Sequence, residues 1–184
     1  MPRQVFLFDP PERFIAGTVG EPGDRTFYLQ ATAGGRTVSV ALEKLQVAVL
    51  AERLEELLGE VQSRLGVDLP PEAPDLEDLA PLDAPVEEEF RVGTMGLAWD
   101  GDAGLVVVEA HAQTGDEEEE APEPLTDAVD GPDVLRVRIN ASAARAFISR
   151  ATRVVAAGRP PCPLCGLPLD AEGHVCPRQN GFRR

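Results

Sequence analysis

The sequence lacks the features that would place the chain in a membrane. Its longest uninterrupted run of apolar residues is five, from Val47 to Ala51, whereas a membrane-spanning helix needs roughly 20. The N-terminus has no apolar stretch of signal-peptide length before Asp9. These two absences predict a cytoplasmic protein that makes no use of a membrane.

Lysine, aromatic residues and cysteine are also scarce. Lys44 is the only lysine beside sixteen arginines, and aromatic residues make up 5% of the chain. All three cysteines lie between residues 162 and 176. An odd number of closely spaced cysteines is a poor disulfide framework, and a long stretch without cysteine suits a reducing compartment. Disulfide bonding therefore does not account for the cluster.

Familiar catalytic motifs are missing as well. The sequence contains no glycine-rich phosphate loop, no Ser-His-Asp order and no helical paired-histidine motif. Glu109 and His111 share one face of an expected strand and could serve in acid–base chemistry or metal binding. No nucleophile or third ligand is recognisable near them, so we expect both on a solvated face.

The sequence does contain a large and uneven excess of acid. The formal charge of the 184 residues is −15. Residues 134–184 hold nine arginines and two acidic residues, a charge of +7, while residues 1–133 hold 8 basic and 30 acidic residues, a charge of −22. This asymmetry predicts either neutralisation of one half by the other or a charged surface for a partner.

The apolar pattern predicts an α+β protein. A helix is expected from about Glu43 to Leu65, because its apolar residues recur at spacings of three and four, and a second from Ala141 to Ala157. Glu52, Glu56 and Glu60 repeat on another, solvated face of the first helix. The expected strands are residues 5–8, 14–19, 26–32, 36–40, 87–100, 105–113 and 134–139.

Two parts of the chain show the same order of elements. The segments 14–20 and 90–96 share Phe, Gly, Thr and Gly at aligned positions, and each precedes a hairpin and a helix. This predicts an internal duplication of an antiparallel strand–strand–strand–helix half, with two separate sheet units or one continuous sheet. The predicted division is residues 1–66 and 87–158 for the halves, 67–86 for a proline-rich acidic linker and 159–184 for a zinc-knuckle-like appendix. Residues 114–133 are predicted to be a mobile acidic insertion.

The cysteine cluster has the spacing of a structural zinc site. Cys162, Cys165, His174 and Cys176 follow the pattern C-x2-C-x8-H-x-C. Two thiolates in a tight turn can bind one Zn²⁺, and Gly166 permits the positive φ that such a turn often requires. Three thiolates and one imidazole leave no open coordination position, which is typical of structural zinc. Zinc would also order a tail that has few apolar residues.

Three alternative roles for the cluster fit the sequence less well. A redox C-x-x-C normally begins a helix after a strand, whereas prolines surround this one. A catalytic zinc would require one of the four residues to be a non-ligand. Free reduced cysteines are the remaining alternative.

Arginines form a candidate surface for a polar partner or a nucleic acid. Arg145, Arg150 and Arg153 fall on the side of the second helix opposite its apolar residues. Aromatic side chains for base stacking are scarce nearby, which makes nucleic-acid binding the weaker interpretation. The candidate contacts are Arg136, Arg138, Arg145, Arg150, Arg153 and Arg178.

Segments at the start, middle and end of the chain carry a family resemblance. They are residues 5–14 (VFLFDPPERF), 93–98 (GTMGLA), 162–166 (CPLCG) and 173–181 (GHVCPRQNG). Together they resemble an actinobacterial family of uncharacterised proteins, domain of unknown function 3090. The resemblance implies a bacterial cytosolic protein and supplies no activity and no catalytic residue.

Three functions are compatible with these observations. The first is a non-enzymatic protein-binding or assembly module with a structural zinc site, whose partner is another protein. The second is nucleic-acid binding through the C-terminal arginines. The third is an enzyme acting on a small phosphorylated or thiol metabolite, with Glu109, His111 or Arg138 in a pocket.

Overall fold

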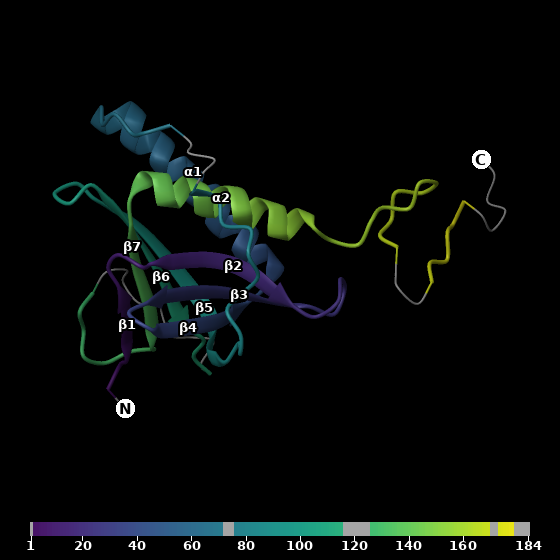
Figure 1. The fold of residues 1–184 in the computed structure, drawn as a ribbon, viewed down its shortest axis with the longest axis horizontal. Coiled ribbons are helices and arrows are strands. Elements are labelled where there is room, and N and C mark those ends of the chain that lie inside the picture. Colours follow the sequence, from purple (N-terminus) through teal and green to yellow (C-terminus); the bar gives the residue numbers. More distant parts are fainter. Residues whose placement is uncertain (1, 72–75, 116–125, 170–172, 179–184) are drawn as a thin grey trace.

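The computed structural model describes residues 2–71, 76–115, 126–169 and 173–178, and it shows an α+β protein with one sheet and two helices (Figure 1). Every predicted strand and helix is present, with bounds within two residues of those expected from the sequence. The helices are α1 (Lys44–Leu65) and α2 (Ala141–Ala156). The strands are β1 (Val5–Phe8), β2 (Arg13–Val19), β3 (Thr26–Ala33), β4 (Arg36–Leu42), β5 (Glu88–Asp100), β6 (Leu105–Ala112) and β7 (Val134–Ile139).

Both halves of the chain contribute to one continuous sheet. Its strand order is β1-β7-β6-β5-β4-β3-β2. Strands β2, β3 and β4 form one antiparallel meander, and β5, β6 and β7 form another. Parallel pairing of β4 with β5 joins the two meanders, and β1 adds a further strand parallel to β7. The sheet is therefore larger than either predicted half.

The sheet curls strongly. Strands β1 and β2 stand at opposite ends of the strand order, yet only residues 9–12 connect them. That connection spans at most about 18 Å, whereas seven flat strands would extend about 29 Å. The curl brings the rings of Phe6 and Phe90 to 6.2 Å and places the Arg36 guanidinium over Phe6 and Phe8.

Both helices lie on one side of the sheet and enclose the main core (Figure 1). Helix α1 contacts α2 and β5, and α2 also contacts β2. The predicted apolar stripe of α1 is buried, except that Leu57 is half-buried, and the predicted acidic face is exposed. Among the described residues no helix is both long and apolar enough to span a membrane.

Two connecting segments contact the sheet residues that point away from the helices. The first is residues 76–86, here called the strap, in which Leu82 packs at Gly17 and the Asp83 backbone exchanges hydrogen bonds with the Gln30 side chain. The second is residues 126–133, beside β6 and β7. Residues 116–125 of the predicted mobile insertion, which include the acidic run 116–120, lie outside the described residues.

Candidate metal centre and its surroundings

The C-terminal tail brings the four predicted metal ligands together. The ligand atoms of Cys162, Cys165, His174 and Cys176 all lie within 4.8 Å of one another. The Sγ atoms of Cys162 and Cys176 are 3.9 Å apart, and Cys165 Sγ is 3.2 Å from His174 Nε2. Tetrahedral zinc with Zn–S bonds of about 2.3 Å places its sulfur ligands about 3.8 Å apart. The four side chains therefore fit a single metal ion.

Backbone hydrogen bonds fix the turn that carries the first two cysteines. Cys162 N donates to Leu167 O at 2.7 Å, and Gly166 N donates to Cys162 O at 2.8 Å. Gly166 has a φ of 75°, the positive value expected from the sequence. Cys162 and Cys176 are buried, although neither belongs to the main hydrophobic core of the described residues. The turn thus presents two sulfur atoms to one point in space.

Backbone donors also control the charge of the first thiol. The N–H groups of Cys165 and Leu164 lower the pKa of Cys162 to about 6, so this side chain is a thiolate at pH 7. Desolvation raises the pKa of Cys165. A thiolate is the form that binds metal, so the turn prepares Cys162 as a ligand.

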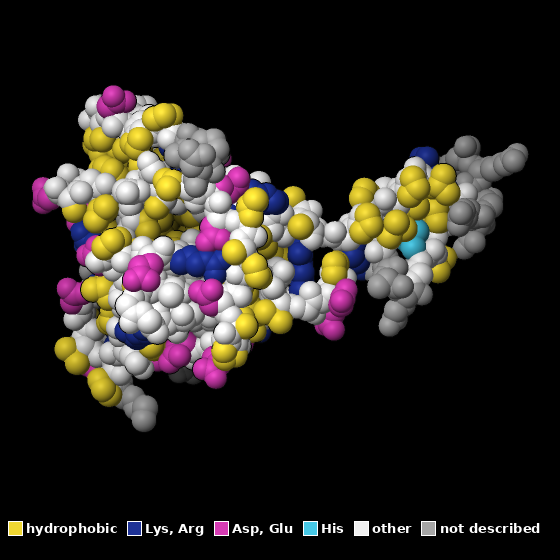
Figure 2. Space-filling model, viewed as in Figure 1, with side chains coloured by type: hydrophobic (Ala, Val, Ile, Leu, Met, Phe, Trp, Pro, Cys, Tyr) yellow, Lys and Arg dark blue, Asp and Glu magenta, His cyan; other side chains and the backbone are white. Residues whose placement is uncertain are grey.

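The tail extends away from the body and carries apolar side chains on its surface. Leu164, Leu167 and Val175 are 46%, 49% and 79% exposed. Figure 1 shows the tail projecting beyond α2, and Figure 2 shows hydrophobic side chains gathered on it. These three apolar side chains therefore lie open to solvent near the candidate metal centre.

Glu109 and His111 are buried, so the expectation that they lie on a solvated face is wrong. Glu109 is 0% and His111 is 2% exposed. One carboxylate oxygen of Glu109 lies 3.0 Å from His111 Nε2, and the other accepts from Arg136 Nε at 2.6 Å. Arg3 approaches His111 Nδ1 at 3.4 Å. The alternation of side chains along β6 correctly predicted that both residues share one face of the strand, but other segments of the chain cover that face.

The candidate arginines do not form one face. Arg136 and Arg138 are on β7, Arg145, Arg150 and Arg153 are on α2, and Arg178 is exposed on the tail. Contrary to the expected polar surface, Arg150 is 6% exposed. Their partners are Glu109 and Asp127 for Arg136, Asp9 and Asp100 for Arg138, Pro70 O and Gln62 for Arg145, Ala16 O and Asp78 for Arg150, and Glu77 for Arg153.

These ion pairs shift the pKa values of the groups involved. Burial opposes the charge of Arg136, but hydrogen bonds to Asp127 and Glu109 raise its pKa overall. The hydrogen bond from Arg13 lowers the pKa of Asp78. Burial lowers the pKa of Arg150. The positive charge of the C-terminal part is thus partly neutralised by acids of the N-terminal part.

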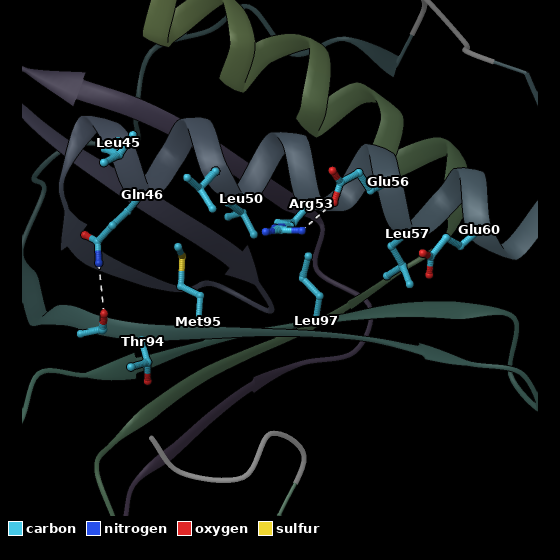
Figure 3. A pocket seen from close by; sticks show the side chains of 12 residues that line it. Leu45, Gln46, Leu50, Arg53, Glu56, Leu57, Glu60, Thr94, Met95 and Leu97 are labelled. Atoms are coloured by element: carbon cyan, nitrogen blue, oxygen red, sulfur yellow. Dashed lines mark hydrogen bonds and ion pairs between the residues drawn. The ribbon is translucent and has the colours of Figure 1, made fainter. Parts of the chain in front are cut away.

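The sequence did not indicate a groove that lies between α1 and β5. Its volume is about 760 Å³, and Leu45, Val49, Leu57, Met95 and Leu97 supply its apolar lining (Figure 3). Leu45 and Val49 are 72% and 38% exposed. These two apolar residues lie outside the buried stripe of α1, and their position was the one feature of the sequence that could have indicated the groove.

Comparison with known proteins identifies a family for this chain. The family model described as "Protein of unknown function (DUF3090)" matches residues 6–176. No curated protein and no solved structure matches the chain. The matched region runs from β1 through the sheet and helices to Cys176, and so includes all four Cys and His side chains of the candidate metal centre.

Proposed function

Because the chain belongs to the DUF3090 family of proteins of unknown function, we propose a function from the site alone: a non-enzymatic protein-binding or assembly module with a structural zinc site. The observation that carries the proposal is the set Cys162, Cys165, His174 and Cys176 gathered within 4.8 Å. Zn²⁺ bound by three thiolates and one imidazole has no open position for a substrate. The role of the ion is to hold the tail in shape.

The shape of the tail matters because it presents a contact surface. Leu164, Leu167 and Val175 are exposed on a segment that stands off the body. Few apolar residues stabilise this segment, so metal ligation supplies the free energy that orders it. We infer that the partner is another protein of the bacterial cytoplasm that contacts these apolar side chains.

The other two functions have less support. Nucleic-acid binding needs arginines available to phosphates, whereas Arg136, Arg138, Arg150 and Arg153 already have partners within the chain. An enzyme using Glu109 and His111 would need access for a substrate, and both side chains are almost completely buried. In a salt titration, the absence of any affinity for RNA or DNA even at low salt would eliminate the nucleic-acid function.

The first test is metal content. Elemental analysis of protein purified without chelator should give about one zinc per chain. The His174→Ala variant should lose most of this zinc, because three ligands leave the coordination shell open. A tail that stays fully ordered without metal would overturn the structural role.

The second test separates the contact surface from the metal. In pull-downs of the full chain, Leu167→Asp should keep zinc and lose the bound protein. Leu65→Asp, the same change at an exposed leucine of α1, is the matched control and should keep both. Retention of the same partners by Leu167→Asp would contradict the proposed surface.

A further inference from the structure

Strand β5 is longer than the neighbouring strand β4. It pairs with β4 only near its beginning, with Ser39 opposite Glu88 and Ala41 opposite Arg91. Strand β4 ends at Leu42, whereas β5 continues to Asp100 and remains paired with β6. In the part of the chain that the structure describes, no strand lies on the other side of residues 94–100. This part of β5 is an open edge inside the sheet.

The register identifies the backbone groups at that edge. Ala112 N donates to Asp133 O beside β7, and Gln113 N donates to Arg91 O on β5. Backbone N–H and C=O groups alternate in direction along a strand, so those of His111 point the same way as those of Gln113, toward β5. There they face Thr94, the residue paired with His111. The groups of Thr94, Gly96 and Ala98 consequently face β6. Those of Met95, Leu97 and Trp99 face the open side.

The groove described above runs along this edge. Met95 and Leu97 point toward α1, and Leu50 and Leu57 point back toward β5 (Figure 3). At the near end of the groove, Gln46 Nε2 donates to Val92 O and Gly93 O at 3.2 Å each. Helix α1 therefore satisfies the carbonyl groups where it first meets β5. It leaves the following backbone groups beside an apolar space of about 760 Å³.

Strand β2, at one end of the strand order, is contacted by another segment of the same chain. At β2, Arg150 joins Ala16 O to the carbonyl oxygen of Asp78 in the strap. Leu82 of the strap packs at Gly17 on the same strand. The strap thus lies against the face of β2 that points away from the helices, whereas among the described residues no strand pairs with residues 94–100 of β5 on their open side.

The charge of the elements that form the groove favours a positively charged occupant. The two elements that form the groove, α1 and β5, hold 7 acidic and 4 basic residues, a charge of −3. Three charged residues line the groove, Arg53, Glu56 and Glu60, and Arg53 pairs with Glu56 at 2.9 Å, which leaves Glu60 as the excess charge of the lining. A segment with basic side chains is attracted to such a surface, and an acidic one is repelled.

We propose that an extended, basic segment of a partner protein adds to the open edge of β5 as an additional strand. Its backbone pairs with Met95, Leu97 and Trp99, alternate apolar side chains enter the groove, and basic side chains between them face the acidic surroundings. This inference rests on the proposed protein-binding function and gives it a second contact site, distinct from the zinc-bearing tail.

The probe for the test is a blocked peptide of eight residues with alternating valine and arginine. Binding to the full chain is followed by the fluorescence of Trp99, the only tryptophan, and by amide exchange of β5 in NMR. The amides of Met95, Leu97 and Trp99 should exchange quickly in the free protein and become protected with peptide. The amides of Thr94, Gly96 and Ala98 should be protected in both states.

Control peptides distinguish backbone pairing from non-specific binding. A peptide with glutamate in place of arginine should bind at least about tenfold more weakly. The valine–arginine peptide with every backbone nitrogen methylated cannot donate hydrogen bonds, and it should not bind detectably. Equal binding of the methylated peptide would overturn strand addition.

Protein variants locate the site. Val49→Arg and, as an independent variant, Leu45→Arg place a charge in the groove at partly or largely exposed positions, so the fold should be retained. Each should weaken peptide binding by about tenfold or more. Leu65→Arg, on the same helix outside the groove, is the matched control and should change the affinity by less than about twofold.

The remaining outcomes are decisive. If Val49→Arg dissociates a dimer of the chain and the peptide does not bind, the edge is filled by a second copy and the proposal is wrong. If an apolar small molecule binds in the groove and leaves the amides unprotected, it is also wrong. If both groove variants keep the partners that Leu167→Asp loses, this inference fails while the proposed function stands.

Discussion

Glu109 illustrates how one residue can be buried with its charge. On β6 it lies directly opposite Arg136 of β7, and both its oxygens have partners, in Arg136 Nε and His111 Nε2. Arg136 also pairs with the exposed carboxylate of Asp127. The pair therefore connects the interior of the molecule to the segment that covers it. A buried carboxylate with this set of partners is a structural link between strands and a covering loop.

Removal of this carboxylate should be strongly destabilising. We expect Glu109→Ala to lower the free energy of unfolding by about 3–5 kcal/mol, because Arg136 loses its buried counter-charge. Glu60→Ala, at an exposed position on α1, should change it by less than about 0.5 kcal/mol. Denaturant unfolding at pH 7 measures both. A loss below about 1 kcal/mol for Glu109→Ala would mean that water already screens the pair.

Alternation alone could not have revealed this pair. The sequence placed Glu109 and His111 on one face correctly, since β6 is a regular strand. Whether that face meets water depends on Arg3 and on residues 126–133, which are distant in sequence from β6. The clustering of the four Cys and His side chains was easier to predict, because all of them lie within fifteen residues and need only a local turn to meet.

The strap is an element defined by its contacts rather than by its secondary structure. Arg13 binds Asp78 through two bonds, from Nε at 2.5 Å and from Nη2 at 3.0 Å, and reaches Asp83 with Nη1. Leu82 fills the space left by the missing side chain of Gly17. Polar anchors and one apolar contact thus hold an irregular segment against β2 and β3.

Substitution of Gly17 should displace this segment. A Cβ at Gly17 would lie 2.6 Å from Leu82 Cγ, so Gly17→Ala should cost about 1–3 kcal/mol. Leu82→Ala in the same chain should recover part of that loss, which a double-mutant cycle measures. Gly59→Ala, within α1, is the control. A Cβ at Gly59 would have no neighbour within 4 Å, so this substitution should stabilise the protein by about 0.5–1 kcal/mol. Additive effects of Gly17→Ala and Leu82→Ala would contradict the contact.

The Arg13–Asp78 pair should make the strap sensitive to acid. The pKa of Asp78 is lowered by the Arg13 hydrogen bond, so its contribution to stability is present above the ordinary value of about 3.9 and is lost as pH falls through the lowered pKa. We expect Asp78→Asn to be less stable than the natural chain at pH 7, with the difference shrinking toward pH 2. Unfolding measured across this range tests the sign. A difference that is constant with pH would contradict it.

The two similar segments show what sequence comparison can and cannot establish about an element. Gly17 and Gly93 occupy matching positions in β2 and β5, but a Cβ would meet Leu82 in one case and the backbone of Gln113 in the other. Different neighbours thus favour glycine at both positions. The shared order of three strands and a helix is observed, and the internal duplication itself stays a prediction.

At the scale of the whole molecule, the charge split is partly resolved within the chain. Arg138 and Arg153 from the basic part pair with Asp100 and Glu77 from the acidic part. The split in sequence therefore describes contacts across the fold more than two separate surfaces. The groove beside β5 could not be foreseen in this way, because its existence depends on β5 continuing where β4 turns into α1.

The body and the tail should respond differently to removal of metal. The main core contains residues of the sheet and both helices but neither Cys162 nor Cys176. One place where the tail approaches the body is at Gly23, beside the Arg159 side chain. If metal ligation supplies the stability of the tail, as proposed above, chelation should unfold the tail and leave the body folded.

Calorimetry and limited proteolysis test this independence. With chelator, cleavage within residues 159–184 should become rapid, while the Tm of the main transition should shift by less than about 2–4 °C, the effect of roughly 1 kcal/mol in a domain of this size. His174→Ala without chelator should reproduce both results. If chelation instead lowered the Tm of the body by much more, the tail would be stabilising the sheet, and its role as a projecting contact surface would have to be abandoned.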